Sequence, residues 1–421
     1  MRIVHFDVDD LHNPWGGGQA RRTYEVSKRL ATWFGWDVTV VTGHYPGAIP
    51  REVDVPRGRL RYIRAGGGPF PINFLSFVAS MPLMVRMIDH DLLIEDFTSP
   101  VGPSALPRFA TRPVVGSAQF LFAPEMARKY RLPFNLIATA LFPGYQSLIT
   151  LTNHSKALLE PLAPTASVTQ IPQGLDRGSF VDRDLIVGGG DCVLYMGRLD
   201  RDQKGIDILI NAWVVMPRGA RPPLIIAGDG RDRLALMREV QMRGLGQSIS
   251  FAGRVDGTSK ASLLKRARII VMPSRYETYG IVAIEAMAHG IPLVASNLPE
   301  LREVAEGGAL LVPTADPHSL AKAVAHLWDA KDFRVLLGRT GRSRVEGLTW
   351  DLVASMQAAV YVRALHKHQE NTRFRTENWS FSTSVSHLYL APILAHSTRP
   401  FRQNDVHPHT PSLMRSQNGS R

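Results

Sequence analysis

The sequence predicts an α/β protein with two parallel-sheet domains that follow one another along the chain. Its 421 residues exceed one ordinary domain and fit two. Short β-branched runs alternate with helical patterns in both halves, which is typical of βαβ units. Several runs, such as Ile269-Ile270-Val271-Met272, are apolar at every position. Continuous apolarity indicates strands that are covered on both faces, as in parallel sheets.

The expected strands divide evenly between the two halves. In the first half we expect strands at residues 2–7, 37–42, 60–64, 91–95, 113–118 and 147–152. In the second half we expect them at residues 192–196, 223–227, 249–252, 268–272, 292–296 and 309–312. The glycines at 188–190 separate the halves. Each half therefore predicts a Rossmann-like domain, whose ligand crevice lies at the carboxyl ends of the strands.

The pattern also predicts domain limits. We expect an N-terminal domain over residues 1–170 and a C-terminal domain over residues 171–348. Thr349-Trp350 opens a last helical segment, expected to end near residue 368. Residues 369–421 are predicted to be a disordered tail, because residues 371–421 hold eight serines, several prolines and no lysine.

Composition and charge narrow the class of protein. The single cysteine, Cys192, excludes an intrachain disulfide and favours a reducing compartment, so we expect a cytoplasmic protein. The first residues show a strand pattern and no signal-peptide pattern. The net charge of +12 suits phosphorylated substrates, acidic lipid surfaces or nucleic acid. Nucleic acid is not favoured, because no basic block has interleaved aromatic residues.

Residues 70–88 are the nearest approach to a membrane span. They contain Pro71, Asn73, Pro82 and Arg86, so they do not predict a spanning helix. Two interpretations stay open: a helix packed on its own domain, or an amphipathic helix in peripheral contact with an anionic membrane, at its inner face.

A glycine-rich loop follows the first expected strand. Residues 13–22 read N-P-W-G-G-G-Q-A-R-R and lead into a helix. Consecutive glycines let the backbone approach a ligand, and a helix N-terminus offers unpaired N–H groups to an anion. The loop lacks the G-x-G-x-x-G and P-loop patterns. A phosphate contact and a plain tight turn are both compatible with it.

Two cations follow the first expected strand of the second half. Arg198 and Lys204 lie in G-R-L-D-R-D-Q-K-G over residues 197–205. At the carboxyl end of a parallel strand they could neutralise a diphosphate, arginine as a planar fork and lysine as a point charge. The alternative is a solvated loop in which Asp200 or Asp202 pairs with them.

The most informative segment is residues 273–290. The expected helix from Ile281 to Ala288 is apolar on every side except at Glu285, and an all-apolar helix is buried. A carboxylate within it is costly unless it is paired. Glu277 precedes the helix, and eight residues of helical rise span about 12 Å. That separation suits two polar points on one elongated ligand, with the N–H groups near Thr278 and Gly280 facing phosphates between them. The alternative is a core carboxylate paired with an internal arginine.

At these residues the sequence resembles the GT-B nucleotide-sugar glycosyltransferases, specifically the retaining family 4 (group 1). Residues 273–292 resemble the family hallmark P-S-x-x-E-x-x-G-x-x-x-x-E-A-M-A-x-G-x-P. Matching in order and spacing are Gly197-Arg198, Lys204-Gly205, A-G-D-G at 227–230, F-A-G-R-V at 251–255 and Q-G-L-D at 173–176. The resemblance implies two Rossmann-like domains facing a central cleft, with a last helix that crosses back onto the first domain.

The resemblance also implies roles for individual residues. The residues implied in catalysis are Arg198 and Lys204, which would hold the donor diphosphate, and Glu277, which would contact the transferred sugar. Glu285 would bind the ribose hydroxyls. The other implied donor contacts are Gly17, Gly18, Arg254, Val255, Thr278, Tyr279, Gly280 and Ile281. Asn13 and Gln119 are the candidate contacts to the acceptor or the sugar.

This chain departs from the family pattern at two positions. Many relatives have a histidine near the end of the fifth strand of the first domain, where this chain has Gln119. A glutamine can donate a hydrogen bond but cannot carry a proton, which weakens any acid–base role there. The usual Asn-Gly turn reads Gln173-Gly174 here.

The implied reaction transfers a sugar from a UDP- or GDP-sugar to an acceptor hydroxyl with retention of configuration. A lipid-linked or cell-envelope glycan is a plausible acceptor. A retaining hydrolase needs two carboxylates about 5 Å apart, so neither Glu277 nor Glu285 is assigned as a nucleophile. No clustered Asp-x-Asp follows a strand of the second half, so we expect no metal requirement. Asp7, Asp9 and Asp10 are the one tight acidic group, interpreted as strand end and loop or as acceptor contacts.

Other classes of function are weighed against this one. The runner-up is a catalytically silent GT-B subunit that binds a glycan or nucleotide and regulates another enzyme. A nicotinamide dehydrogenase would need G-x-G-x-x-G after the first strand and an acidic residue at the end of the second, and neither is present. A nucleic-acid binder would need a basic stripe, whereas residues 371–421 alone carry six arginines against two acidic residues.

Overall fold

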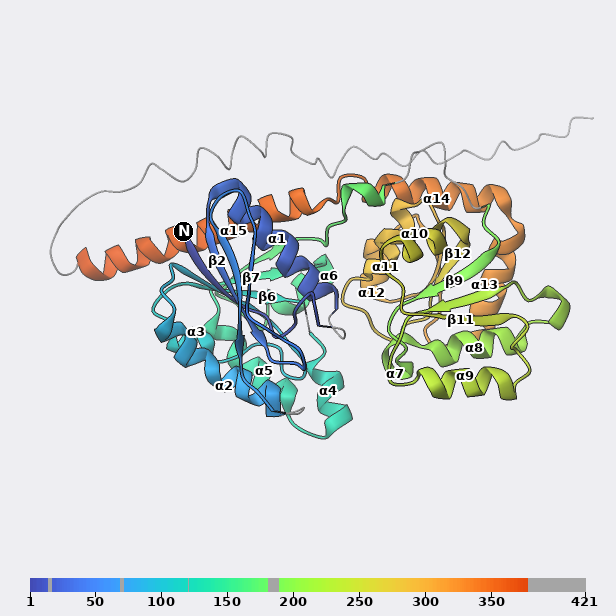
Figure 1. The fold of residues 1–421 in the computed structure, drawn as a ribbon, viewed down its shortest axis with the longest axis horizontal. Coiled ribbons are helices and arrows are strands. Elements are labelled where there is room, and N and C mark those ends of the chain that lie inside the picture. Colours follow the sequence, from blue (N-terminus) through green and yellow to red (C-terminus); the bar gives the residue numbers. More distant parts are fainter. Residues whose placement is uncertain (14–16, 69–71, 120, 181–188, 378–421) are drawn as a thin grey trace, which may run out of the picture. The chain divides into compact units, whose positions relative to one another are not determined.

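The computed structural model describes residues 1–13, 17–68, 72–119, 121–180 and 189–377. Among them, residues 2–170 form a lobe around an eight-stranded sheet, here called the N-terminal lobe (Figure 1). Every strand pair is parallel except β3 with β4. The strands in spatial order are β3 (Arg51–Val53), β4 (Arg59–Ala65), β2 (Asp37–Gly43), β1 (Arg2–Phe6), β5 (Leu92–Asp96), β6 (Val114–Ala118), β7 (Ser147–Thr150) and β8 (Ser167–Gln170).

A second, all-parallel sheet forms the centre of the C-terminal lobe, here defined as residues 192–345. From β9, the first strand of the lobe, the strand order runs through β10 to β11 on one side and through β12 and β13 to β14 on the other, so the order reverses between β9 and β12. In spatial order the strands are β11 (Ile249–Gly253), β10 (Leu224–Ala227), β9 (Cys192–Met196), β12 (Ala267–Met272), β13 (Leu293–Ser296) and β14 (Ala309–Val312).

Helices cover both faces of each sheet. In Figure 1, α1 lies on one side of the N-terminal sheet and α2, α3 and α5 lie on the other. The N-terminal lobe contains α1 (Gly18–Phe34), α2 (Ile72–Met87), α3 (Leu106–Phe109), α4 (Ala123–Tyr130), α5 (Phe134–Leu141), the 3-10 turn η1 (Phe142–Gly144) and α6 (Asn153–Leu159). The connection and the C-terminal lobe contain η2 (Arg177–Ser179), α7 (Arg201–Lys204), α8 (Ile206–Val215), η4 (Arg218–Ala220), α9 (Arg233–Met242), α10 (Gly257–Arg266), α11 (Ile281–Ala288), α12 (Pro299–Val304), α13 (Pro317–Asp329) and α14 (Lys331–Val345).

All twelve expected strands are present, and two more were not expected. The two additional strands, β3 and β8, both lie at the edges of the N-terminal sheet. Neither contains a continuous apolar run, because an edge strand is covered less than a central one and its side chains stay partly exposed. The apolar-run criterion therefore missed both edge strands of the N-terminal sheet, although it found β11 and β14 at the edges of the C-terminal sheet.

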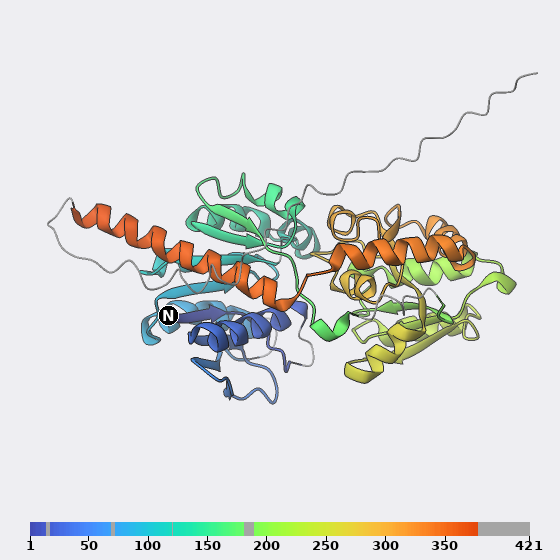
Figure 2. The ribbon, with the colours of Figure 1, turned by 90° about the horizontal axis from the view of Figure 1, so that it is seen from above.

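The last helix is longer than the sequence indicates. Helix α15 (Trp350–Glu377) passes the expected end at residue 368 by nine residues, because no glycine or proline interrupts the segment. It packs along α1, as Figure 2 shows, and Arg29 of α1 donates to Asp351 at 2.7 Å. The first nine residues of the predicted tail are thus helical, and residues 378–421 lie outside the described part of the chain.

The strand orders fix where a ligand can bind. In each sheet the order reverses beside the first strand of the lobe, between β1 and β5 and between β9 and β12. In open α/β sheets the crevice outside the carboxyl ends of the strands at such a point is where ligands bind. The segments after β1, β5, β9 and β12 are therefore the places to look for a site.

Among the helices that the structure describes, none combines the length and the apolar composition that crossing a membrane requires. Helix α2 covers residues 72–87 of the segment 70–88, and Phe70 and Pro71 lie outside the described residues. Its side chains Phe77, Met81 and Val85 are buried against the lobe.

Candidate functional site

The segment after β9 presents Arg198 at the carboxyl edge of the C-terminal sheet. Gly197 turns the chain with φ of +152°, and the next-but-one residue, Leu199, is fully buried and anchors the loop. Arg198 between them is exposed. Asp200 then caps α7 by accepting from the Gln203 N–H at 3.1 Å. The local fold thus holds a guanidinium at the reversal point of the sheet.

Lys204 and Glu277, two predicted site residues, contact each other. The Lys204 Nζ donates to Glu277 Oε1 at 2.6 Å, and Ser274 Oγ donates to the same oxygen at 2.8 Å. The Glu277 side chain is only 6% exposed, so its carboxylate needs these partners. The sequence alternative of Lys204 paired with Asp200 or Asp202 is wrong, because Arg231 pairs with both acids.

Helix α11 carries Glu285 about one turn after its start at Ile281. Gly280 precedes the helix with φ of +86°, and a Cβ there would lie 2.6 Å from Leu301 Cδ2. As expected, Ala283, Ile284 and residues 286–288 are buried. The Glu285 side chain stays 17% exposed, and Lys260 Nζ donates to its Oε1 at 2.5 Å. The partner is thus a lysine from α10, not the internal arginine of the alternative interpretation.

The glycine loop of the N-terminal lobe approaches both of these segments. A Cβ on Gly17 would lie 4.0 Å from the Arg198 guanidinium, and one on Gly18 would lie 2.0 Å from Ile281 Cδ1. A side chain at Gly18 would therefore require the Ile281 side chain to move where the start of α1 meets the start of α11. Gly17 caps the 17-residue helix α1, whose first N–H groups have no partner within the helix. Gly16 lies outside the described residues.

Two buried carboxyl groups end β1 and β5. Thr23 Oγ1 lies 2.7 Å from Asp7 Oδ2 and 2.9 Å from Asp96 Oδ2. Burial, and then the charge of Asp96, raises the pKa of Asp7 well above its usual value. Burial acts the same way on Asp96, but the His5 ring and hydrogen bonds outweigh it and lower that pKa. The Thr23 hydroxyl has only one proton, so it can donate to only one of the two carboxyl groups. Both contacts are satisfied when Thr23 donates to Asp96 and a protonated Asp7 donates to Thr23.

Gln119 joins this buried pair. Its Nε2 donates to Asp96 Oδ1 at 3.2 Å, and its Oε1 accepts from Gln173 Nε2 at 3.3 Å. The side chain is 7% exposed and is held by both ends of its amide. Gln119 therefore acts as a fixed dipole between the N-terminal lobe and the connecting segment.

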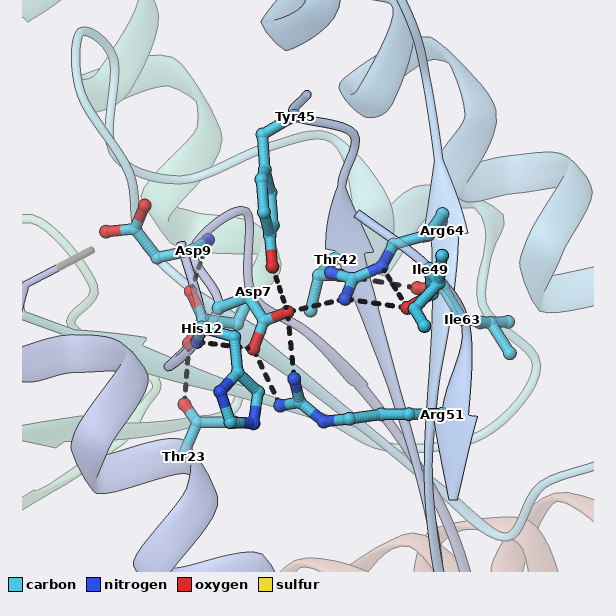
Figure 3. Close-up of polar contacts among 11 residues, drawn as sticks. Asp7, Asp9, His12, Thr23, Thr42, Tyr45, Ile49, Arg51, Ile63 and Arg64 are labelled. Carbon is cyan, nitrogen blue, oxygen red and sulfur yellow. Dashed lines mark hydrogen bonds and ion pairs between the residues drawn. The ribbon is translucent and has the colours of Figure 1, made fainter. Parts of the chain in front are cut away.

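Asp10 lies at the centre of a separate buried cluster, whose members Tyr45, Arg51 and Arg64 are labelled in Figure 3. Its carboxylate accepts from Arg51 at 2.7 Å, from Arg64 at 2.5 Å and from the Tyr45 hydroxyl at 3.1 Å. The Asp10 side chain is fully buried. The cluster ties the loop after β1 to β3 and β4.

Asp9 differs from its two neighbours. Figure 3 shows its carboxylate turned away from the Asp10 cluster. Burial raises the pKa of Asp9, and the positive charge of Arg198 opposes that rise most strongly. The carboxyl group also accepts a hydrogen bond from the Gly17 backbone. Asp9 thus lies where the glycine loop faces Arg198, and the acidic run after β1 was the only sequence signal for it.

The other predicted contacts have different surroundings. Arg254 is exposed after β11, Thr278 and Val255 are half-buried, and the Asn13 N–H donates to the Asp10 carbonyl at 2.9 Å. Tyr279 is 4% exposed, and its ring packs in the core of the C-terminal lobe. Its ring therefore supports the loop before α11 from the core side. Lys260, the partner of Glu285, carried no signal in the sequence.

Within the described ranges, no group of three or more His, Cys, Asp or Glu side chains is arranged to hold a metal ion. The charged groups in the segments after β1, β9 and β12 form separate contacts: Asp9 is influenced by Arg198, Lys204 pairs with Glu277, and Glu285 pairs with Lys260. Cations beside a helix N-terminus can bind an anion such as a diphosphate, and the carboxylates can accept from hydroxyl groups.

Two α/β lobes with parallel sheets define the GT-B class of protein, and solved structures share this fold. A sucrose-phosphate synthase from Thermosynechococcus elongatus superposes with a TM-score of 0.72 at 23% identity, covering 87% of this chain and 100% of that chain. An Anabaena protein solved with UDP and glucose gives a TM-score of 0.65 at 17% identity, covering 85% of this chain and 98% of that one.

Two family models match the two lobes. The model described as Glycosyltransferase Family 4 matches residues 16–178, and the model described as Glycosyl transferases group 1 matches residues 190–330. The chain belongs to the family 4, group 1 glycosyltransferases.

Curated relatives agree with this assignment. A phosphatidyl-myo-inositol mannosyltransferase of Mycobacterium leprae is 29% identical over 319 residues, which are 71% of this chain and 83% of the relative. A glycogen synthase of Mycobacterium tuberculosis is 29% identical over 385 residues, which are 83% of this chain and 91% of the relative.

Proposed function

We propose that this protein transfers a sugar from a nucleoside diphosphate donor to a hydroxyl group of an acceptor, with retention at the anomeric carbon. One observation carries the proposal. Gly17, at the start of α1, faces Arg198, which follows β9, and Lys204 lies beside Glu277 at the point where the strand order of the C-terminal sheet reverses. This is an anion site with carboxylates next to it, as a nucleotide sugar requires.

The two cations would stabilise the leaving group. As the bond from the anomeric carbon to the diphosphate oxygen breaks, negative charge grows on the diphosphate, and fixed cations there lower the barrier. The Lys204 ammonium has three N–H donors, and its bond to Glu277 uses one, which leaves donors for phosphate oxygens. The exposed Arg198 offers a planar fork to the same group.

The carboxylates would hold the hydroxyl groups of the donor. Lys204 and Ser274 bond Oε1 of Glu277, so we assign its Oε2 to the transferred sugar. Lys260 likewise bonds Oε1 of Glu285, and we assign Oε2 to the ribose. The main chain at Thr278–Ile281 would meet the phosphates, and the main chain at Arg254 and Val255 would meet the base.

The acceptor oxygen would attack from the face that the diphosphate leaves. A bond from the anomeric carbon to the acceptor oxygen forms, and the acceptor proton passes to the departing diphosphate oxygen. Gln119 is held by Asp96 and Gln173 and has no proton to exchange, so it would orient the sugar without acid–base chemistry. Asn13 and Asp9 lie beside the glycine loop, where we place the acceptor.

The donor and acceptor classes extend this proposal. UDP- and GDP-sugars are the proposed donors, and the Anabaena neighbour was solved with UDP and glucose. A lipid-linked or cell-envelope glycan is the proposed acceptor, since relatives include phosphatidyl-myo-inositol mannosyltransferases. The single buried Cys192 fits a reducing compartment, so we place the reaction in the cytoplasm.

A transfer assay tests the proposal. Purified protein is incubated with UDP- or GDP-sugars and lipid-linked acceptors, with and without a chelator, and the product's anomeric configuration is determined by NMR. We expect turnover with one donor, a retained configuration and no loss on chelation. Nucleotide binding without hydrolysis or transfer would favour a silent regulatory subunit, and an inverted product would refute retention.

A further inference from the structure

Helix α2 is apolar on two opposite sides, but the lobe covers only one of them. Phe77, Met81 and Val85 recur every four residues and are buried. A second stripe follows the same helical period on the opposite side and remains in solvent. Its large members are Ile72, 55% exposed, Leu75, 61%, Leu83, 57%, and Met87, 70%.

Further exposed apolar side chains lie on the helices that follow α2 on the same side of the sheet. Nine of the eighteen exposed large apolar side chains in the described chain fall within residues 72–137. Helix α2 contacts α3, and α4 contacts α5, and Figure 1 shows these helices on one side of the N-terminal sheet. The members beyond α2 are Phe109, Tyr130, Leu132, Leu136 and Ile137. We call all nine residues the apolar surface.

Exposed cations lie in the same segments as the apolar surface. Helices α2 to α5 and their connections within residues 106–141 contain six exposed cations: Arg86, Arg108, Arg112, Arg128, Lys129 and Arg131. Glu125 is the single acidic residue in the same segments, and it pairs with Arg128 at 3.1 Å. Lys129 pairs with Asp202 at 3.6 Å, and nearby Asp89 and Asp91 pair with Arg2. The excess of positive charge is therefore concentrated beside exposed apolar groups.

We propose that the apolar surface docks onto an anionic lipid bilayer, with its side chains inserted at the headgroup level and the surrounding cations on the lipid phosphates. Helices with apolar residues on one face and arginine or lysine at its border bind membranes in this way without crossing them. A second copy of this chain is disfavoured as the occupant, because self-pairing would bring like charges together.

The proposal goes beyond sugar transfer and does not rest on it. The apolar surface shares no residue with the proposed donor site. Vesicle binding can therefore fail while transfer to a soluble acceptor succeeds, and the reverse also holds. If both are correct, docking would bring the acceptor side of the N-terminal lobe to a lipid-linked substrate.

Vesicle sedimentation tests the proposal with the full chain. Vesicles of phosphatidylcholine alone are compared with vesicles containing about one third phosphatidylglycerol, at low and at high salt. We expect binding to the anionic vesicles that weakens with salt, because surface charges are screened. Equal binding to neutral vesicles, or none to either, would overturn the proposal.

Matched variants locate the contact. The triple variant Leu75→Gln, Leu83→Gln, Leu136→Gln should bind anionic vesicles at least about tenfold more weakly, since each leucine inserts apolar area. The control is Leu234→Gln with Met242→Gln on α9, at positions 66% and 81% exposed, and it should bind like the wild type. Binding that persists in the triple variant would assign it to other cations, including the arginines of residues 378–421, and would overturn the proposal.

Two further measurements distinguish lipid docking from a loss of folding and from self-association. The leucines in the triple variant are exposed, so its melting temperature and its nucleotide-induced thermal shift should match the wild type. Sedimentation velocity without lipid should show the same mass for both proteins. A dimer that the triple variant dissociates would make a second copy the occupant and refute lipid docking.

Discussion

The carboxyl edges of the two sheets both carry ionisable side chains, but these side chains have different surroundings at the two edges. At the N-terminal edge, Asp7, Asp96 and Asp10 are almost fully buried and bond to groups within the lobe. At the C-terminal edge, Arg198 is exposed, and Glu277 and Glu285 are paired with the flexible side chains of Lys204 and Lys260.

The difference indicates a structural role for the N-terminal edge and a ligand-binding role for the C-terminal edge. Buried charges with fixed partners cannot exchange them for a ligand without a large cost, so they set the shape of the N-terminal edge. Lysines at 21% and 32% exposure can shift onto phosphate oxygens, since water already reaches them. The N-terminal edge is therefore a frame, and the C-terminal edge is where a charged ligand exchanges partners.

The largest effect should be a loss of folding stability when a buried carboxylate of the N-terminal edge is removed. Asp10→Asn leaves Arg51 and Arg64 without their carboxylate, and removing one partner of a buried ion pair costs about 3–5 kcal/mol. Urea unfolding of the full chain, followed by circular dichroism, measures this loss as a lower free energy of unfolding. The control Asp191→Asn removes an exposed pair with Arg266 and should cost less than about 1 kcal/mol. Equal losses in both variants would refute the contrast.

A pH dependence should follow from Glu95 at the end of β5. Burial raises its pKa to about 7, although Tyr145 and Ser104 donate to it. The folded protein holds this proton more tightly than the unfolded chain. The stability from this group is therefore complete below about pH 4.5 and is lost as pH rises through 7. The loss is about 3 kcal/mol, at 1.36 kcal/mol per unit of pKa.

The variant Glu95→Gln isolates that group. Its free energy of unfolding should vary less between pH 4.5 and 8 than that of the wild type, because glutamine has no proton to lose. Chemical unfolding at a series of pH values measures both profiles. Parallel profiles would show that Glu95 does not titrate in this range.

Arg198→Ala tests the C-terminal edge, where we expect a charged ligand to bind. It should lower the rate of sugar transfer by about 10²-fold or more, because the cation acts on charge that grows in the transition state. Its folding stability should change little, since Arg198 is exposed. Arg243→Ala on α9, which removes a pair with Glu239, should keep the wild-type rate. Wild-type rates in the Arg198 variant would remove this residue from the mechanism.

Glu285→Gln should have the smallest effect. Hydrogen bonds to charged groups contribute about 1.5–3 kcal/mol, so the donor should bind roughly tenfold more weakly or worse. Titration calorimetry with the preferred nucleotide measures this. Glu239→Gln changes a carboxylate of similar exposure that pairs with Arg201 and Arg243, and it should leave the affinity unchanged. Unchanged affinity in both variants would make Glu285 a core residue.

The sequence predicted the central strands of both sheets, because runs such as that of β12 are apolar at every position. It did not predict β3 and β8, whose residues are partly or fully exposed and form no continuous apolar run. It also placed the end of the last helix too early, at residue 368, because a polar helical surface resembles a tail in composition.

For the candidate site, sequence spacing selected Arg198, Lys204, Glu277 and Glu285, which the structure places at one sheet edge. The ion-pair partners could not be predicted from the sequence, because Lys260 and Glu285 are 25 residues apart along the chain and Lys204 and Glu277 are 73 residues apart. Such pairs depend on how α7, α10 and α11 pack. Asp10 was interpreted only as strand end, loop or acceptor contact. Its partners Arg51 and Arg64 lie on β3 and β4, and the pairing of these strands in the sheet brings them near Asp10, which the sequence does not show.

The most direct test of the exchangeable edge is the thermal shift that nucleotides produce in the wild type and in Arg198→Ala. A nucleoside diphosphate at 100 times its dissociation constant should stabilise the wild type by about 2.7 kcal/mol. We predict this shift for UDP or GDP, and a much smaller one at the same concentration in the variant. A wild type that no nucleotide stabilises, or a variant with an undiminished shift, would contradict the assignment of a donor to the C-terminal edge.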